Sequence, residues 1–269
     1  MRRVIENTVV ILLIFLVSSC EKIVELDLDE SPPQLVIEAN LDKELEELTV
    51  SISESNTYYS TDGYNRILGA NLELQTPNGE VLEVEEIGEG EYRLATQDLE
   101  NGIYTLSAEI DGTVYVASSE LREQIPIFDL VTEFTEETTF NDEGYFVYTR
   151  FADPVDEANF YRFVHYIDGV VENDGDDLQV LDDDLFNGNL ARVPLFQKVF
   201  EPGTTVTVDL VHFDAASYDY FNSLSDIISG GGGPGGGTAA PGNPNTNWSG
   251  GALGYFTAQT TSTASVLIE

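Results

Sequence analysis

Cysteine, methionine, tryptophan and histidine are scarce in this chain. Its 269 residues include one Cys, one Met, one Trp and two His. A single thiol cannot form an internal disulfide, so stability must come from buried apolar surface. Catalytic zinc usually takes three protein ligands, and two histidines without H-x-x-x-H or H-x-H spacing do not supply them. We therefore expect His165 and His212 to be strand residues with ordinary local partners.

Basic residues are also few. Eleven Lys and Arg stand against 49 Asp and Glu, which gives a formal net charge of −38. Nucleic-acid binders need a basic patch to displace counterions, so that class is excluded. Most of the acidic residues are expected to form a solvated surface. A hydrophobic content of 42%, with 14 Phe and 13 Tyr, argues for a folded core despite the charge.

Catalytic motifs are missing as well. The sequence has neither G-x-S-x-G nor G-x-x-x-x-G-K-[ST], and the glycine tract at 230–237 is not followed by Lys-Ser or Lys-Thr. Carboxylate pairs could serve a glycosidase, but among 49 acidic residues no pair stands out. We predict that the protein is not an enzyme.

The sequence has no long apolar run, and the longest short one lies near the N-terminus. Val9–Val17 is too short for the roughly 20 residues of a membrane-spanning helix. It follows Arg2 and Arg3 and precedes VSSC at 17–20, the order of a lipoprotein signal peptide with a lipobox. We predict cleavage after residue 19 and lipidation of Cys20, with several palmitate-type chains as a stable anchor. The alternative is an ordinary signal peptide with a chance cysteine.

Turn signals divide the rest of the chain. Residues 20–33 form a short acidic lead, in which residues 24–28 alternate like a strand. Residues 34–125 predict an Ig-like or transthyretin-like β-sandwich, with hairpin turns at Pro77-Asn78-Gly79 and Asp111-Gly112. Its predicted strands are Gln34–Asn40, Glu47–Glu54, Asn71–Thr76, Glu80–Glu86, Tyr92–Ala95, Gly102–Ile110 and Thr113–Ser119.

Residues 126–269 predict a β-rich second domain. It carries one helix at 214–229, capped by Asp214, and a glycine-rich loop at 230–247. The fold class is therefore mainly β, with two antiparallel β-sandwich-like domains, the second carrying one short helix. The predicted strands here are Asp129–Phe140, Gly144–Ala152, Asn159–Val171, Ala191–Phe200, Thr204–Phe213, Gly254–Thr260 and Ala264–Glu269.

An acidic segment at 172–184 is the best metal candidate. Calcium takes six to eight oxygens, often from closely spaced carboxylates. The EF-hand pattern is absent, and the favoured alternative is a solvated acidic loop that binds no cofactor. The candidate calcium ligands are Asp174, Asp176, Asp177, Asp182, Asp183 and Asp184.

Aromatic residues could form a ligand or partner surface. Aromatic rings outside a core suit stacking and interface contacts. The alternative is ordinary loop packing. The candidates are Tyr58, Tyr59, Tyr64, Trp248 and Tyr255.

Several short motifs occur in an order that covers the mature chain. They are CEKIVELDL at 20–28, LVIEA at 35–39, Asp153-Pro154, NFYR at 159–162, DDLFNG at 183–188, YDYF at 218–221 and NWSGGALGYF at 247–256. In this order the chain resembles the DUF4249 lipoproteins of Bacteroidetes. The resemblance implies an outer-membrane lipoprotein associated with TonB-dependent receptors, and it carries over no catalytic residue. Glu21-Lys22 only partly matches a surface-export signal, so both the outer and the periplasmic face of the outer membrane stay as alternatives for its location.

We therefore expect a lipid-anchored outer-membrane protein that acts as a non-catalytic accessory or binding subunit beside a TonB-dependent transporter in nutrient uptake. The alternative is a free-standing surface adhesin or glycan-binding module, assisted by calcium.

The lipid anchor can be tested directly. Cys20→Ala removes the thiol that accepts the lipid, so the protein should be released from the membrane or remain unprocessed. Fractionation followed by mass spectrometry of the N-terminus measures both. Unchanged membrane retention of the variant would contradict lipidation.

Overall fold

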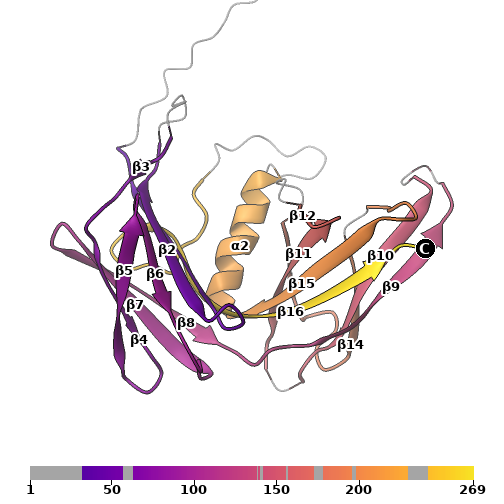
Figure 1. Cartoon of the computed structure of the whole chain (residues 1–269), viewed down its shortest axis with the longest axis horizontal. Coiled ribbons are helices and arrows are strands. Elements are labelled where there is room, and N and C mark those ends of the chain that lie inside the picture. The colour runs from indigo at the N-terminus through magenta and orange to yellow at the C-terminus, as the bar shows by residue number, and fades with distance from the viewer. Residues whose placement is uncertain are drawn as a thin grey trace, which may run out of the picture. The chain divides into compact units, whose positions relative to one another are not determined.

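The strands of this protein form one large sheet and one small sheet, accompanied by a single helix (Figure 1). The structure is a computed structural model that describes residues 32–269 except 57–62, 138, 140–141, 156, 173–177, 196–197 and 230–241. The predicted mainly β class with one helix is confirmed. Cys20, the acidic lead up to residue 31 and most of the glycine-rich loop lie outside the described residues. Pro33–Glu269 form one compact unit, and the division at residues 125 and 126 stays a prediction.

The large sheet runs in the order β12-β11-β15-β16-β1-β2-β6-β5-β4-β7-β8, with β13 on β11 and β3 on β2. The small sheet has the order β14-β10-β9. The strands are β1 (Leu35–Asp42), β2 (Glu47–Glu54), β3 (Asn65–Arg66), β4 (Asn71–Gln75), β5 (Val81–Gly88), β6 (Glu91–Ala95), β7 (Gly102–Ile110), β8 (Thr113–Leu121), β9 (Ile127–Thr135), β10 (Gly144–Ala152), β11 (Phe160–Ile167), β12 (Val170–Val171), β13 (Gln179–Asp182), β14 (Leu190–Pro194), β15 (Thr205–Phe213) and β16 (Leu253–Leu267).

Both predicted hairpins are confirmed. β4 and β5 pair around Pro77-Asn78-Gly79, where the Gly79 N–H donates to the Thr76 carbonyl at 2.9 Å. β7 and β8 pair around Asp111-Gly112, and both turn residues have positive φ (50° and 77°). A two-residue type I′ hairpin requires this conformation, which Asp and Gly tolerate.

The C-terminal region differs most from the prediction. The two expected strands at Gly254–Thr260 and Ala264–Glu269 are one continuous strand, β16. Its first half pairs with β1 in parallel, so the large sheet is mixed and not wholly antiparallel. Its second half pairs antiparallel with β15. The Ser- and Thr-rich residues at 260–263 stay in the strand because the β15 ladder satisfies their backbone groups.

Smaller differences concern strand ends. The strand predicted at Asn159–Val171 is divided into β11 and β12 by a turn at Asp168-Gly169, a dipeptide that the sequence also predicts to form a turn. The predicted strands Ala191–Phe200 and Asp129–Phe140 end earlier, at Pro194 and Thr135. Strands β3 and β13 were not predicted, because they are too short to show an alternating pattern.

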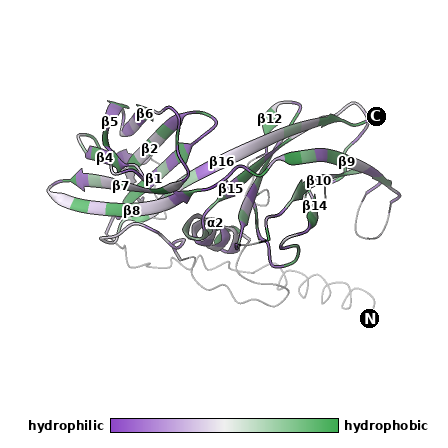
Figure 2. Cartoon of the chain, turned by 90° about the horizontal axis from the view of Figure 1, so that it is seen from below, coloured by the Kyte–Doolittle hydropathy of each residue, from purple (hydrophilic) through white to green (hydrophobic). Residues whose placement is uncertain are grey.

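Residues of contrasting hydropathy follow one another along the strands, as the colour bands on β8 in Figure 2 show. On β1 the odd-numbered residues Ile37, Ala39 and Leu41 are fully buried in the first core, together with Trp248 and Phe256 from the C-terminal region. A second core lies between β10, β11, β14 and β15. The even-numbered residues of β1 therefore point to the opposite face of the sheet.

The helix α2 (Ala215–Ile228) matches the predicted segment. Asp214 caps it as expected: its carboxylate accepts from the Ser217 N–H at 2.8 Å. Tyr220 and Phe221 are buried against Phe213 of β15 and Tyr255 of β16, so α2 covers one end of that sheet face. Within the part of the chain that the structure describes, no helix has the length and apolar character to cross a membrane.

Gly254 tests the β1–β16 pairing. It has φ +90°, and a Cβ there would collide with the backbone oxygen of Ile37 on β1. We expect Gly254→Ala to lower the free energy of unfolding by about 3 kcal/mol, from combined strain and overpacking. Gly251→Ala is the matched control: its φ is +84° but its Cβ would meet nothing within 4 Å, so about 1 kcal/mol is expected. Urea denaturation measures both, and equal losses would contradict the close approach.

Candidate ligand-binding site

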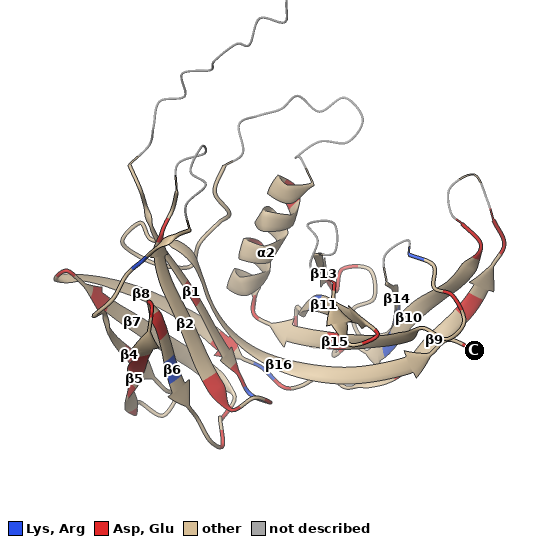
Figure 3. Cartoon of the chain, turned by 45° about the horizontal axis from the view of Figure 1, so that its top comes forward, with Lys and Arg blue, Asp and Glu red and all other residues tan. Residues whose placement is uncertain are grey.

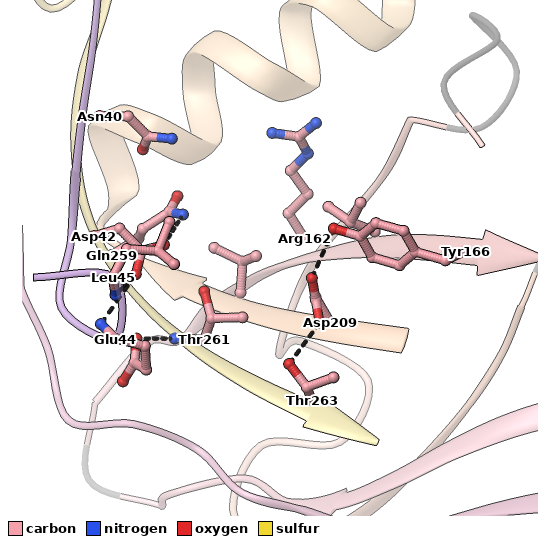
Figure 4. Close-up of a pocket in the computed structure, with 12 residues that line it drawn as sticks. Asn40, Asp42, Glu44, Leu45, Arg162, Tyr166, Asp209, Gln259, Thr261 and Thr263 are labelled. Atoms are coloured by element: carbon pink, nitrogen blue, oxygen red, sulfur yellow. Dashed lines mark hydrogen bonds between the residues drawn. The ribbon is translucent and has the colours of Figure 1, made fainter. Parts of the chain in front are cut away.

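A cavity of about 420 Å³ lies on the sheet face beside α2 (Figure 4). Four strands that come from distant parts of the sequence line it: β1, β11, β15 and β16. Val164 and Val211 supply apolar surface, and the turn after β1 contributes Leu45. The remaining lining side chains are polar or charged. Small-molecule sites are usually lined mainly by apolar side chains with a few polar groups, so this lining is more polar than is usual.

Arg162 on β11 is the most unusual residue of this cavity. Its guanidinium lies over the ring of Phe221, 4.7 Å from the centroid, and forms no ion pair or hydrogen bond with any described residue. In contrast, each of the other arginines in the described ranges pairs with a carboxylate: Arg66, Arg93, Arg122, Arg150 and Arg192. Burial lowers the pKa of Arg162, while Tyr255, Tyr166 and Tyr220 act to raise it. The side chain still stays protonated, because arginine does not lose its charge in proteins.

Asp209 on β15 is a diagonal neighbour of Arg162 in strand register, as is Asp182 on β13, and of these two only Asp209 lines the cavity. It accepts hydrogen bonds from the hydroxyls of Tyr166, at 3.0 Å, and Thr263, at 2.6 Å. Burial, followed by the contact with Asp209, raises the pKa of Tyr166, so this hydroxyl stays protonated and remains a donor. These two bonds hold the Asp209 carboxylate in place on the cavity floor (Figure 4).

The opposite wall is formed by β1 and the turn that follows it. Asp42 accepts from the backbone N–H groups of Glu44 and Leu45 and from the Gln259 amide, at 2.8–3.0 Å. Glu44 accepts from the Thr261 N–H at 2.6 Å and from the Gln124 amide at 3.0 Å. Burial raises the pKa of Glu44. Both carboxylates therefore already have several donors.

Two buried oxygen atoms in the cavity lack partners. Asn40 Oδ1 and Thr261 Oγ1 form no hydrogen bond within the described structure. In Figure 4, Asn40 and Arg162 lie on opposite sides of the cavity. Buried polar atoms in native proteins are nearly always bonded to protein, water or ligand. The site thus contains a guanidinium and two buried oxygen atoms that have no hydrogen-bond partner among the described residues.

The three predicted metal ligands that the structure describes have different surroundings. Asp183 is buried and accepts from the Asn159 N–H at 2.9 Å, whereas Asp182 accepts from the Tyr218 hydroxyl at 3.3 Å and Asp184 is exposed. Asp174, Asp176 and Asp177 lie outside the described residues. Among the residues that are described, no three His, Cys, Asp or Glu side chains form a metal-binding group. Figure 3 shows the acidic residues distributed over both sheets and their connections.

The predicted aromatic surface is only partly consistent with the structure. Trp248 is 5% exposed and its indole N–H donates to the Ile37 carbonyl at 2.9 Å, so it belongs to the core and offers no stacking face. Tyr255 packs against Tyr220 under α2, with 4.6 Å between ring centroids. Tyr64 is exposed, and Tyr58 and Tyr59 lie outside the described residues. The sequence does not distinguish a buried Trp248 from an exposed one, because this residue follows a polar, glycine-rich stretch.

Several of the short motifs meet in a buried polar network. The hydroxyl of Tyr161 donates to Asp153, at 2.5 Å, and its ring stacks on His212. His212 Nδ1 lies 2.8 Å from the Glu123 carbonyl and its Nε2 3.2 Å from the Asn159 side-chain oxygen. Burial lowers the pKa of His212. The prediction of ordinary partners is confirmed for this histidine, and the network has a structural role.

Comparisons with known proteins give a family and little else. No curated protein matches the chain. Among solved structures, Escherichia coli alpha-2-macroglobulin activated by porcine elastase is 14% identical with a TM-score of 0.25, covering 67% of this chain and 18% of that one. A two-domain fibronectin type III segment from chicken tenascin is 13% identical with a TM-score of 0.22, covering 69% and 89%. The chain thus spans less than a fifth of the macroglobulin. A family model described as "Domain of unknown function (DUF4249)" matches residues 21–265, and the chain therefore belongs to the DUF4249 family.

Proposed function

We propose that the protein is a non-catalytic binding subunit, anchored by lipid at Cys20 in the outer membrane, that holds a small carboxylate-bearing molecule in the cavity beside α2. The observation that carries the proposal is Arg162, a half-buried guanidinium that pairs with none of the carboxylates among the described residues, in a chain with 49 acidic residues. With so many carboxylates in the sequence, a pairing would be easy to provide.

The energetics support a ligand role for this side chain. Withdrawing a charge from water is costly unless it is paired and hydrogen-bonded, and a contact with one aromatic ring offsets only part of that cost. Groups that reduce stability in this way are concentrated at binding and active sites. A carboxylate would fit the planar donor fork of arginine with two parallel hydrogen bonds.

The composition of the cavity favours binding over catalysis. Its described lining contains no cysteine, histidine, lysine or serine. Its carboxylates Asp42, Glu44 and Asp209 each accept two or three hydrogen bonds within the protein, which does not favour a general base. Retention of a ligand is therefore the better supported role.

Arg162→Met tests the site, with Arg93→Met as control because Arg93 pairs with Glu47 away from the cavity. The probe is a pool of amino acids, dipeptides, hydroxy acids and sugar acids, observed by saturation-transfer NMR with residues 20–269. We expect at least one carboxylate to bind the wild type and the control, and none to bind Arg162→Met. The free energy of unfolding of Arg162→Met should stay within about 1 kcal/mol of wild type or rise, because a desolvated charge is removed.

Two results would contradict this proposal. If no member of the pool binds the wild type, the cavity is not a carboxylate site. If Arg162→Met loses more than about 2 kcal/mol in urea denaturation, the guanidinium serves the packing of α2 instead.

The partnership with a transporter rests on the family resemblance. We expect the native lipoprotein, extracted from outer membranes in mild detergent, to copurify with a near-stoichiometric TonB-dependent barrel. Cys20→Ala should reduce that recovery, because the lipid brings both proteins into one membrane. Recovery of the lipoprotein alone would instead favour a free-standing adhesin or glycan-binding module.

A further inference from the structure

Arg162 and Asp209 carry opposite charges on neighbouring strands of one sheet face, yet they do not pair. In the β11–β15 register, Arg162 is opposite Val211 and Asp209 is opposite Val164. The two charged residues are thus diagonal neighbours on paired strands, positions that lie roughly 7–8 Å apart across the two strands. Long side chains at such positions can reach each other. Here the guanidinium lies over Phe221, and the carboxylate is held by Tyr166 and Thr263.

Asp209 retains capacity to bind a cation. Both of its hydrogen-bond donors are neutral hydroxyls, and it forms no ion pair within the described ranges. An ionised carboxylate can accept about four hydrogen bonds, so about two acceptor sites remain. Asp42 differs in that it already accepts from three N–H donors. Glu44 accepts from two donors, as Asp209 does, but both are N–H groups and none is a hydroxyl.

The charge balance of the cavity disfavours a simple anion. Three carboxylates, at Asp42, Glu44 and Asp209, face one guanidinium. A ligand with only negative charge would gain from Arg162 but would be repelled by the other three groups. A ligand that also carries a positive group would be attracted by Arg162 at its negative end and by the carboxylates at its positive end.

We infer that the ligand is a zwitterion with a carboxylate and a protonated amine a few atoms apart, as in an amino acid or a short peptide. The carboxylate binds Arg162 and the ammonium group binds Asp209. Val164 and Val211 contact the carbon chain. This inference rests on the proposed function, since it specifies the ligand of the same cavity.

The cavity volume is compatible with this class. About 420 Å³ lies in the lower part of the roughly 300–1,000 Å³ range of small-molecule pockets. A free amino acid or a dipeptide is thus of suitable size. The acidic wall further favours members whose side chain is neutral or basic over those with an acidic side chain.

Isothermal titration calorimetry on residues 20–269 tests the inference. The probes are the common amino acids and a set of dipeptides, each compared with its des-amino acid. For the members that bind, we expect the zwitterion to bind at least about tenfold more tightly, the effect of 1.4 kcal/mol. Asp209→Asn should abolish that preference while leaving the affinity for the des-amino acid unchanged or higher. Asp111→Asn is the control: it also removes one negative charge, in a hairpin turn where Asn is tolerated.

Each failure has its own meaning. Des-amino acids that bind wild type as tightly as their zwitterions would overturn the inference and leave the proposed carboxylate site intact. An unchanged zwitterion preference in Asp209→Asn would overturn the assigned role of Asp209. If neither probe class binds wild type, the proposed function itself fails, and the inference fails with it.

Discussion

The pairing of β16 with β1 is the interaction on which the rest of this structure depends. It joins the first strand of the described chain to the last one in parallel, from Val36 opposite Leu253 to Asp42 opposite Gln259. β16 then continues along β15 to Leu267. A glycine at 254 permits the close approach to Ile37, whose carbonyl also accepts the Trp248 indole N–H. One strand therefore supplies side chains to the first core and extends the sheet into the second.

The cavity is a consequence of this pairing. Strand alternation directs the odd-numbered residues of β1 into the core and places Asn40 and Asp42 on the other face. On β11 the same alternation buries Tyr161 and Phe163 and places Arg162 on the face covered by α2. Because β16 lies between β1 and β15 in the sheet order, residues more than 100 positions apart line one hollow. The helix covers the neighbouring part of this sheet face through its aromatic contacts with Phe213 and Tyr255.

Much of the fold could be predicted from local patterns. The hairpins at Asn78-Gly79 and Asp111-Gly112 and the helix cap at Asp214 follow from backbone preferences of single residues, which the sequence states directly. The continuous β16 could not be foreseen, because its Ser- and Thr-rich middle resembles a loop until β15 is placed beside it. The candidate site was missed for a related reason. Arg162 lies in the recognised NFYR motif, but the absence of a carboxylate partner among the described residues is a tertiary property that no local pattern encodes. The one available signal was its position between two core aromatics on a strand.

The most direct test of this account is a crystal structure of the lipoprotein purified from native membranes, with attention to the surroundings of the Arg162 guanidinium. The account predicts density for a small molecule bridging Arg162 and Asp209, bonded to the guanidinium through a carboxylate. A carboxylate of the protein itself paired with Arg162, with only solvent in the cavity, would contradict it and make this arginine part of the fold alone.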